Sequence, residues 1–358
     1  MRINQNAKGV VFRNVVEENS GFTLFTTASD KSIYLIDMKG RVVHKWEVDL
    51  VHVYKAELLR NGNLLYTGKT KNGHMSDFED ASGKIIETDW DNSIVWEYVD
   101  SYMHNSFYKK KNGNILFIKW VEVPNNLVNK VKGGVLGNKD NGIMWTDQIC
   151  EINNSKRIIW EWKAYEYLDI DDNVICPVFC RKEWTHANAL YVANDGNILI
   201  NFMLTNTIVK INPETKNIEW SWGPGETSEA HYIDKTFEDD ILIFDNGLHS
   251  IGTSSEFSRV LEVSTSNGKI SWEYLENPLS YFYSSIYGCC QRLENGNTLI
   301  CDSDDGCIFE VNNKKELVWE YINPYYSHDE KYGTNNIVTF ARSYPPDFPG
   351  FENKNFLI

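Results

Sequence analysis

A short apolar phrase that ends in tryptophan returns six times along the chain. The first copy reads Tyr34-Leu-Ile-Asp-Met-Lys-Gly-Arg-Val-Val-His-Lys-Trp46, and the later copies end at Trp96, Trp160, Trp220, Trp272 and Trp319. Successive tryptophans lie 47 to 64 residues apart, a spacing typical of four-stranded propeller blades rather than of helical repeats. The sequence therefore predicts an all-β, six-bladed β-propeller with four antiparallel strands per blade. We expect residues 1–358 to form a single propeller domain.

Tight turns lie upstream of most of these phrases. They are Asn61-Gly62-Asn63, Asn112-Gly113-Asn114, Asp195-Gly196-Asn197 and Asn295-Gly296-Asn297. Asn-Gly and Asp-Gly supply the positive φ angles of two-residue hairpin turns, so we expect a hairpin at each. Glu238-Asp239-Asp240 stands at this place before Trp272, and we expect Asn19-Ser20-Gly21 to take it in the first blade. The sequence does not decide which terminal segment closes the ring, because residues 9–13 and 336–340 could each complete an end blade.

The aromatic content fits this fold. Strands buried between neighbouring blades need large apolar side chains, and the chain has 12 tryptophans among its 358 residues. Because the tryptophans recur in phase with the predicted blades, we interpret most of them as structural. Seven cysteines, an odd number, indicate reduced thiols rather than a disulfide framework.

Charge and hydropathy exclude several classes of partner. The formal net charge is −15 and no basic run is present, which argues against nucleic acid. No apolar run approaches the roughly 20 residues that cross a bilayer, and the first eight residues lack the apolar segment of a signal peptide. We therefore expect a cytoplasmic protein with no membrane partner. A monomer is expected as well, since closed propellers expose few free strand edges.

Two insertions interrupt the repeat, at residues 121–145 and 163–184. Long loops on a rigid scaffold commonly form the wall or lid of a binding site. We expect both to lie over one mouth of the propeller channel, although the first could equally be a solvated excursion.

Histidines stand just before the first strand of successive blades. His52 lies ten residues before Gly62, and His104 lies nine before Gly113. The same position is taken by His186, ten residues before Gly196, and by His231, eight before Asp239. The first strand of each blade lines the channel, so equivalent starts point at one place on the axis. The pattern predicts that these four imidazoles converge there.

Two chemistries suit several imidazoles around one cavity. In the first, a neutral imidazole attacks an electrophile and carries the transferred group, while neighbouring donors stabilise charge on its oxygens. In the second, the set His52, His104, His186 and His231 binds iron, copper or zinc and leaves a position open for substrate. A channel that binds a ligand without catalysis is a third possibility.

Four phrases carry a resemblance to a known family. They are Trp184-Thr-His-Ala-Asn188, Trp222-Gly-Pro-Gly225 followed by His231, Phe244-Asp-Asn-Gly247, and Gln291-Arg-Leu-Glu-Asn-Gly-Asn-Thr-Leu-Ile300. With them the chain resembles the arylsulfotransferases, from about residue 22 to about residue 346. The resemblance implies a six-bladed propeller that moves a sulfuryl group between phenols through a transient sulfohistidine, without the nucleotide donor and with no cofactor.

Position by position, the resemblance implies that His231 is the nucleophile. His186, Asn188 and His104 would bind sulfuryl oxygens, and Ser285 falls near the family's hydroxyl donor. The expected substrate is an aromatic or other apolar small molecule.

One departure concerns the family's arginine, which follows the His-x-Asn strand. The corresponding residues 201–206 contain neither arginine nor lysine, and Met203 stands at that place. Loss of an oxyanion donor typically costs about two to three powers of ten in rate. Either protonated His52 or Arg181 supplies the charge, or the pocket takes a less anionic substrate and uses its histidines for acid and base work. Met203 would then form an apolar wall beside the substrate.

Overall fold

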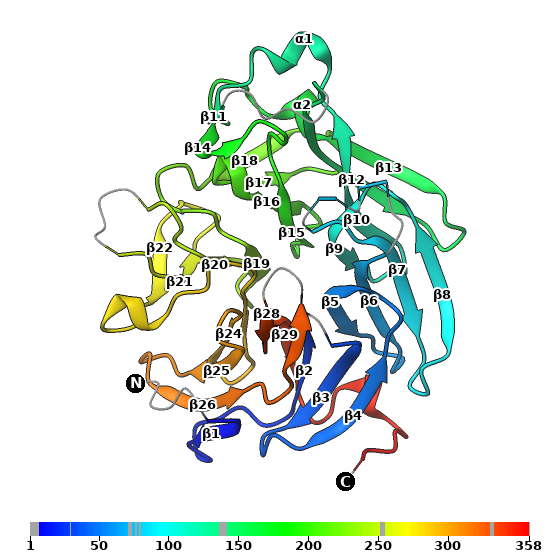
Figure 1. Ribbon diagram of the computed structural model, residues 1–358, viewed down its shortest axis with the longest axis vertical. Helices are drawn as coiled ribbons and strands as arrows, with labels where there is room; N and C mark the ends of the chain where they lie inside the picture. Colours follow the sequence, from blue (N-terminus) through cyan, green and yellow to red (C-terminus); the bar gives the residue numbers. More distant parts are fainter. Residues whose placement is uncertain are drawn as a thin grey trace.

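The computed structural model describes residues 7–28, 30–70, 74–75, 77–78, 80–135, 142–250, 255–329 and 333–357. Within this part of the chain, six antiparallel sheets stand around a central axis, as Figure 1 shows in the view down the ring. The six-bladed propeller predicted from the tryptophan repeat is therefore confirmed.

In each blade the strands succeed one another from the channel to the rim. Blade 1 is formed by β29 (Val338–Tyr344), β2 (Phe22–Thr27), β3 (Ser32–Asp37) and β4 (Val42–Glu47). Blade 2 is formed by β5 (His52–Leu58), β6 (Leu64–Lys69), β7 (Gly83–Thr88) and β8 (Ile94–Val99). Blade 3 is formed by β9 (Met103–Lys109), β10 (Ile115–Glu122), β12 (Trp145–Ile152) and β13 (Ile158–Lys163).

Blades 4 to 6 follow in chain order. Blade 4 is formed by β15 (Ala187–Val192), β16 (Ile198–Phe202), β17 (Thr207–Ile211) and β18 (Ile218–Trp222). Blade 5 is formed by β19 (Tyr232–Lys235), β20 (Ile241–Asp245), β21 (Arg259–Val263) and β22 (Ile270–Tyr274). Blade 6 is formed by β23 (Cys289–Arg292), β24 (Thr298–Asp302), β25 (Cys307–Val311), β26 (Leu317–Ile322) and, outermost, β1 (Gly9–Arg13).

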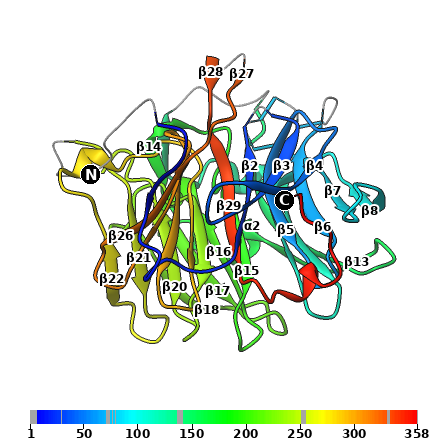
Figure 2. The same cartoon turned by 90° about the horizontal axis from the view of Figure 1, so that it is seen from below.

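The remaining elements are short. They are α1 (Asn125–Val128), α2 (Ala164–Tyr167), the 3-10 turns η1 (Met203–Thr205), η2 (Leu279–Tyr281) and η3 (Pro349–Phe351), the parallel pair β11 (Gly133–Val135) and β14 (Ile175–Cys180), and the hairpin of β27 (Ser327–Asp329) and β28 (Gly333–Asn335). Figure 2 shows this hairpin projecting beyond one face of the ring. No helix in the described ranges is both long and apolar enough to span a membrane.

Tryptophans on β4, β13, β18 and β26 each bond to the following blade. The indole of Trp46 donates a hydrogen bond to the backbone carbonyl of Asp89 in the following blade, and Trp319 donates to Met38 across the junction of blades 6 and 1. Trp160 and Trp222 make equivalent bonds to Pro213 and Gly268. A buried indole thus supplies apolar area and a directed bond to a turn of its neighbour. Trp46, Trp160 and Trp319 belong to the repeat seen in the sequence, whereas Trp222 lies two residues after the repeat residue Trp220.

The tight turns differ from the expected two-residue type. In the turn at Asn61-Gly62, the Gly62 amide donates to the Leu59 carbonyl and the Leu59 amide donates to the Asn63 carbonyl. Only Gly62 has a positive φ, of 83°. These contacts define a three-residue loop, a type I turn followed by a left-handed residue that forms a bulge. Asp239, with φ of 68°, takes the left-handed position in the blade that lacks this glycine.

Both candidate end strands take part in closing the ring. β29 pairs with β2 as the innermost strand of blade 1, while β1 adds a fifth strand to blade 6. The expectation that Asn19-Ser20-Gly21 forms the inner hairpin of blade 1 is therefore wrong, because the strand that pairs with β2 comes from the other end of the chain. Gly21 serves this closure instead: a Cβ there would lie 2.2 Å from the carbonyl oxygen of Tyr344.

The two insertions pack against each other. β11 from the first pairs in parallel with β14 from the second. The guanidinium of Arg181, at the end of the second insertion, donates to the carbonyls of Val128, Val131 and Gly133 in the first. Residues 136–141 of the first insertion lie outside the described residues.

Candidate active site in the propeller channel

A cavity of about 350 Å³ lies at the end of the channel where the innermost strands begin. Loops from several blades form its wall, together with Phe179, Cys180, Lys182 and Glu183 of the second insertion. The aromatic and apolar residues of the lining are Phe78, Phe179, Met203, Leu204, Leu248, Ile286 and Tyr287. A largely apolar cavity with a few polar groups is the usual form of a small-molecule site.

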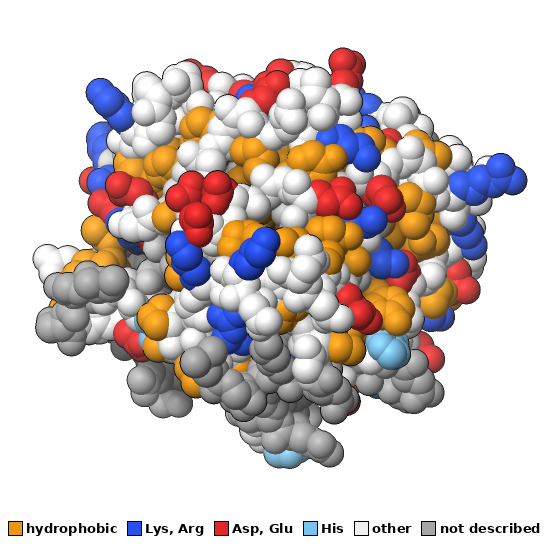
Figure 3. Space-filling view, turned by 90° about the horizontal axis from the view of Figure 1, so that it is seen from above, with side chains coloured by type: hydrophobic (Ala, Val, Ile, Leu, Met, Phe, Trp, Pro, Cys, Tyr) orange, Lys and Arg blue, Asp and Glu red, His pale blue; other side chains and the backbone are white. Residues whose placement is uncertain are grey.

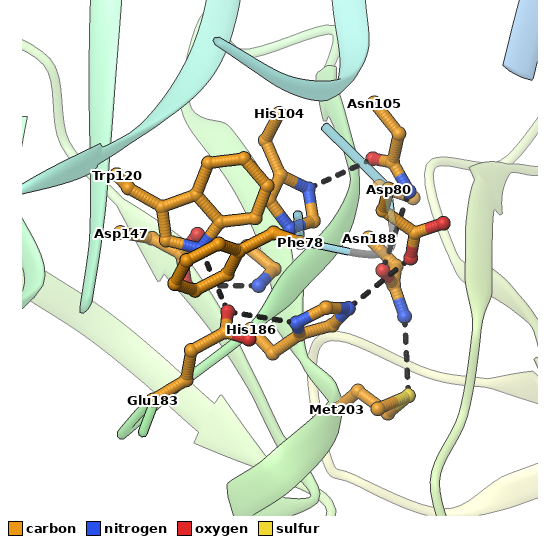
Figure 4. A network of polar contacts seen from close by, with 12 residues as sticks. Phe78, Asp80, His104, Asn105, Trp120, Asp147, Glu183, His186, Asn188 and Met203 are labelled. Atoms are coloured by element: carbon orange, nitrogen blue, oxygen red, sulfur yellow. Dashed lines mark hydrogen bonds and ion pairs between the residues drawn. The ribbon is translucent and has the colours of Figure 1, made fainter. Parts of the chain in front are cut away.

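His186 is held between two carboxylates (Figure 4). Its Nδ1 lies 2.9 Å from Glu183 Oε2 and its Nε2 lies 3.1 Å from Asp80 Oδ2. Burial alone would lower the pKa of His186, but the two negative charges and their hydrogen bonds raise it well above its usual value. The pKa of Asp80, which burial would raise, is held well below its usual range by the same contact. His186 is therefore an imidazolium at neutral pH.

The backbone around His186 is fixed by Asp147. One oxygen of this buried carboxyl accepts hydrogen bonds from the Thr185 hydroxyl and from the Ala187 amide, at 2.5 and 2.8 Å. His186 itself lies between them with a positive φ of 55°. A left-handed conformation at a non-glycine residue stores strain that the surrounding contacts must compensate, and such positions cluster at functional sites.

His104 packs edge-on against His186, with ring centroids 4.7 Å apart. It is the second residue of β9 and is fully buried, and its Nδ1 lies 3.1 Å from the side-chain oxygen of Asn105. Burial, and after it the positive charge of His186, lower the pKa of His104 to about 4. Its Nε2 has no hydrogen-bond partner among the residues that the structure describes.

His231 lines the cavity next to the first residue of β19. Burial lowers its pKa to about 4, against the opposing effect of the Asp80 carboxylate, so the ring is neutral at pH 7. Within the described ranges neither ring nitrogen has a hydrogen-bond partner of normal geometry, although the Gly288 backbone lies close by. A neutral ring with unpaired nitrogens is a competent nucleophile or base.

The other residues singled out in the sequence surround this group. His52 packs against Tyr54 and Tyr287, with ring centroids 4.4 and 5.6 Å away, and is not part of the cavity lining. Tyr287 lies between His52 and His231, and its ring centroid is 5.6 Å from that of His231 as well.

Asn188, Met203 and Ser285 each have a partner in the site. Asn188 Nδ2 lies 3.3 Å from the sulfur of Met203, which does line the cavity. Ser285 also lines it, but its hydroxyl donates to Asp304 at 2.6 Å. The structure thus brings His104, His186, His231, Asn188 and Met203 together at one end of the channel, with His52 behind Tyr287.

Arg181 points away from the cavity, because its guanidinium is buried among backbone carbonyls of the first insertion. The lining instead contains its neighbour Lys182, whose Nζ lies 3.5 Å from the centroid of the Phe78 ring. Within the described ranges no carboxylate pairs with Lys182. Lys182 was not predicted from the sequence, because its neighbour Arg181 was the candidate for the positive charge.

Carboxylates are the other residues that sequence reasoning missed. Asp77, Asp80, Glu183 and Glu229 line the cavity, against Lys182 and the imidazolium of His186. Glu183 stands three residues before His186, a spacing visible in the sequence, whereas the turn around Asp80 carries no repeat or motif that would single it out. The lining is therefore more acidic than the histidine pattern alone implied.

A family model and one solved structure agree with this architecture. A family model described as arylsulfotransferase (ASST) matches residues 9–240. No curated protein is similar in sequence to this chain. A Bacteroides caccae protein of unknown function has a similar structure, with a TM-score of 0.58 and 11% identity over 91% of this chain and 99% of its own. Virginiamycin B lyase from Staphylococcus aureus gives a TM-score of 0.48 and 14% identity, over 89% of this chain and 90% of its own.

Proposed function

The chain belongs to the arylsulfotransferase family, and we propose that it transfers a sulfuryl group between aromatic small molecules through His231. The observation that carries the proposal is the state of this ring. It is buried, neutral at pH 7 and without a hydrogen-bond partner of normal geometry among the described residues, and it faces a cavity of about 350 Å³. These are the properties that a histidine nucleophile needs.

In the proposed reaction, a ring nitrogen of His231 attacks the sulfur of an aryl sulfate. The N–S bond forms while the S–O bond to the phenol breaks, and the departing oxygen keeps the electron pair. An acceptor phenol then attacks the same sulfur and regenerates the neutral ring. The proton that the acceptor loses balances the one that the leaving phenolate takes up. Charge develops mainly on peripheral oxygens, so catalysis depends on positioning and electrostatics.

We assign to Lys182 the role of stabilising the negative charge on those oxygens. The imidazolium of His186 also contributes positive charge, but both of its N–H groups already donate to carboxylates. The ammonium group of Lys182 has no such partner among the described residues, and the ring of Phe78 beneath it provides an apolar face for an aryl group. In this proposal Lys182 takes the role of the family's arginine, whose place in this chain is occupied by Met203.

A continuous assay tests the proposal. The protein is incubated with a chromogenic aryl sulfate, with and without a phenol acceptor, and the released phenol is followed. We expect release that requires His231 and rises with acceptor. The control is His328→Ala, since His328 is exposed on the projecting hairpin. Absence of release at high enzyme concentration would reject sulfuryl transfer.

The acidic lining favours a second candidate, an acid and base reaction on an uncharged apolar molecule. Four carboxylates in the lining disfavour a sulfate anion, whereas the neutral His231 can act as a base. Thermal unfolding with matched pairs of aromatic compounds, sulfated and unsulfated, separates the two. Stabilisation by the sulfated member supports transfer, and stabilisation by the uncharged member alone supports the alternative.

A further inference from the structure

A cluster of side chains of the types that bind metals lies beside the cavity, apart from the channel histidines, and one of its members, Glu229, lines the cavity. It consists of Cys176, Glu229 and His249, whose Sγ, carboxylate oxygen and imidazole nitrogen all lie within 4.8 Å of one another. The Cys176 sulfur is 3.7 Å from Glu229 Oε1, and His249 Nδ1 is 2.5 Å from the same oxygen. We propose that these three residues form a binding site for a divalent transition-metal ion of the zinc class.

The donor set selects this class of ion. Thiolate, imidazole and carboxylate are the three ligand types that Zn²⁺ takes in proteins, and three protein ligands with one open position are typical of its catalytic sites. Mg²⁺ and Ca²⁺ prefer sites made only of oxygen ligands, so the thiolate of Cys176 selects against them. The ligands come from three separate segments, β14, the loop before β19 and the loop after β20.

The backbone holds two of the ligands before any ion binds. Glu229 and His249 both have left-handed φ angles, of 60° and 55°. Their loops are tied together, because Ser228 donates from its hydroxyl to the Leu248 carbonyl and its own carbonyl accepts from the Gly247 amide. The Glu229 amide donates to the side chain of Asn206 at 2.5 Å. Such supporting contacts fix the ligands of a metal site in position.

The three ligands differ in their exposure, and the more exposed ones let an ion reach the cluster from solvent. The Glu229 side chain is 3% exposed, while that of His249 is 38% exposed and Cys176 is intermediate. Glu229 is also part of the cavity lining, as are Leu248 and Phe179 beside His249. An ion on these ligands therefore lies at the cavity wall. Its charge offsets the acidic lining and attracts the oxygens of an anionic substrate.

Spectroscopy with cobalt tests the site without any substrate, so its outcome does not depend on the proposed reaction. The full chain is stripped with a chelator, kept reduced, and titrated with Co²⁺. We expect one ion per chain and a thiolate-to-cobalt charge-transfer band in the near ultraviolet, and Zn²⁺ should displace the cobalt. The band reports sulfur ligation, which the channel histidines cannot provide.

Variants assign the ligands. Cys176→Ser should abolish the band, while the matched control Cys180→Ser, on the same strand, should retain it. Glu229→Gln keeps the shape of its side chain and should weaken Co²⁺ binding by about 100-fold or more, since even changes to outer partners of metal ligands cost about 10–100-fold. Thermal melting of each variant confirms folding.

Three results would overturn the site. They are no specific Co²⁺ binding, a charge-transfer band that survives in Cys176→Ser, or binding that is lost in His104→Ala instead. The last result would assign the ion to His104, Glu183 and His186, whose ligand atoms also lie within 4.8 Å of one another.

Discussion

At the scale of single residues, the site separates three histidines by their surroundings. His186 is charged because two carboxylates contact its ring, whereas His104 and His231 are neutral because they are buried. Pairs of titratable groups whose surroundings push their pKa values apart are the usual sign of divided acid and base roles. This difference in charge suits His231 to act as nucleophile or base and His186 to contribute positive charge to the site.

The pH dependence of activity follows from the pKa of His231. The reaction needs the neutral ring, so kcat/KM should stay constant from pH 7 downward and fall only as the pH approaches about 4, where His231 takes up a proton. The pH profile of kcat/KM reports the free enzyme and is the measurement to make, with circular dichroism at each pH to confirm folding. A midpoint near the ordinary histidine value of about 6.5 would contradict the assigned state of His231.

Lys182 offers a second test at this scale. Removing the charge in Lys182→Ala should lower kcat/KM for an anionic aryl sulfate by about 100-fold or more, the usual cost of losing one oxyanion donor. Lys182→Arg keeps the charge and should retain most of the activity. Steady-state kinetics on both variants decide the matter. Equal rates for Lys182→Ala and the unmodified protein would remove this lysine from the reaction.

At the scale of elements, the two insertions act as one unit that supports the cavity wall. β11 pairs with β14, and Arg181 binds three carbonyls of the first insertion. A guanidinium with five donors can satisfy several carbonyls at once, which an ammonium group cannot do with the same geometry. The position of Phe179, Cys180, Lys182 and Glu183 in the lining therefore depends on this buried arginine.

Arg181→Leu should destabilise the protein rather than impair substrate binding directly. Three carbonyls lose a charged donor, so the free energy of unfolding should fall by about 3 kcal/mol or more, and Arg181→Lys should recover only part of it. Urea unfolding measures the change. If Arg181→Lys kept full stability but raised KM for aryl sulfate, the guanidinium would instead serve the substrate.

At the scale of the whole molecule, a regular repeat made the fold predictable. A tryptophan near the end of each blade's phrase recurs once per blade, and this spacing gave the number of blades. The tight turns gave the place of the inner strands. Ring closure could not be predicted, because both terminal segments are strand-like and their pairing depends on distant partners. Figure 3 shows acidic and basic side chains interspersed on one face, so the net charge of −15 does not mark out a single acidic surface there.

The candidate site was predictable only in part. His104, His186 and His231 were predicted because they stand at equivalent positions near the first strands of successive blades. Asp80 and Glu229 could not be predicted, because they lie in loops whose course depends on tertiary contacts. Lys182 was not predicted, because the neighbouring Arg181 was considered as the source of positive charge instead. The roles of all these residues in a reaction stay predictions.

Ring closure has its own prediction. The Tyr344 hydroxyl on β29 accepts a hydrogen bond from the Leu58 amide on β5, at 2.8 Å. Tyr344→Phe leaves this buried amide without its acceptor, which should lower the free energy of unfolding by about 1–3 kcal/mol. Tyr326→Phe is the control, since Tyr326 is 47% exposed. Equal stabilities of the two variants in urea would show that this contact does not stabilise the closed ring.

The central claim is that His231 carries the transferred group, and peptide mass spectrometry tests it most directly. The protein is mixed with an aryl sulfate in the absence of acceptor, quenched at alkaline pH and digested. The account predicts a sulfuryl adduct on the peptide that contains His231, formed together with released phenol and removed when an acceptor phenol is added. Phenol release with the adduct on another residue, or with no adduct at any time, would contradict it.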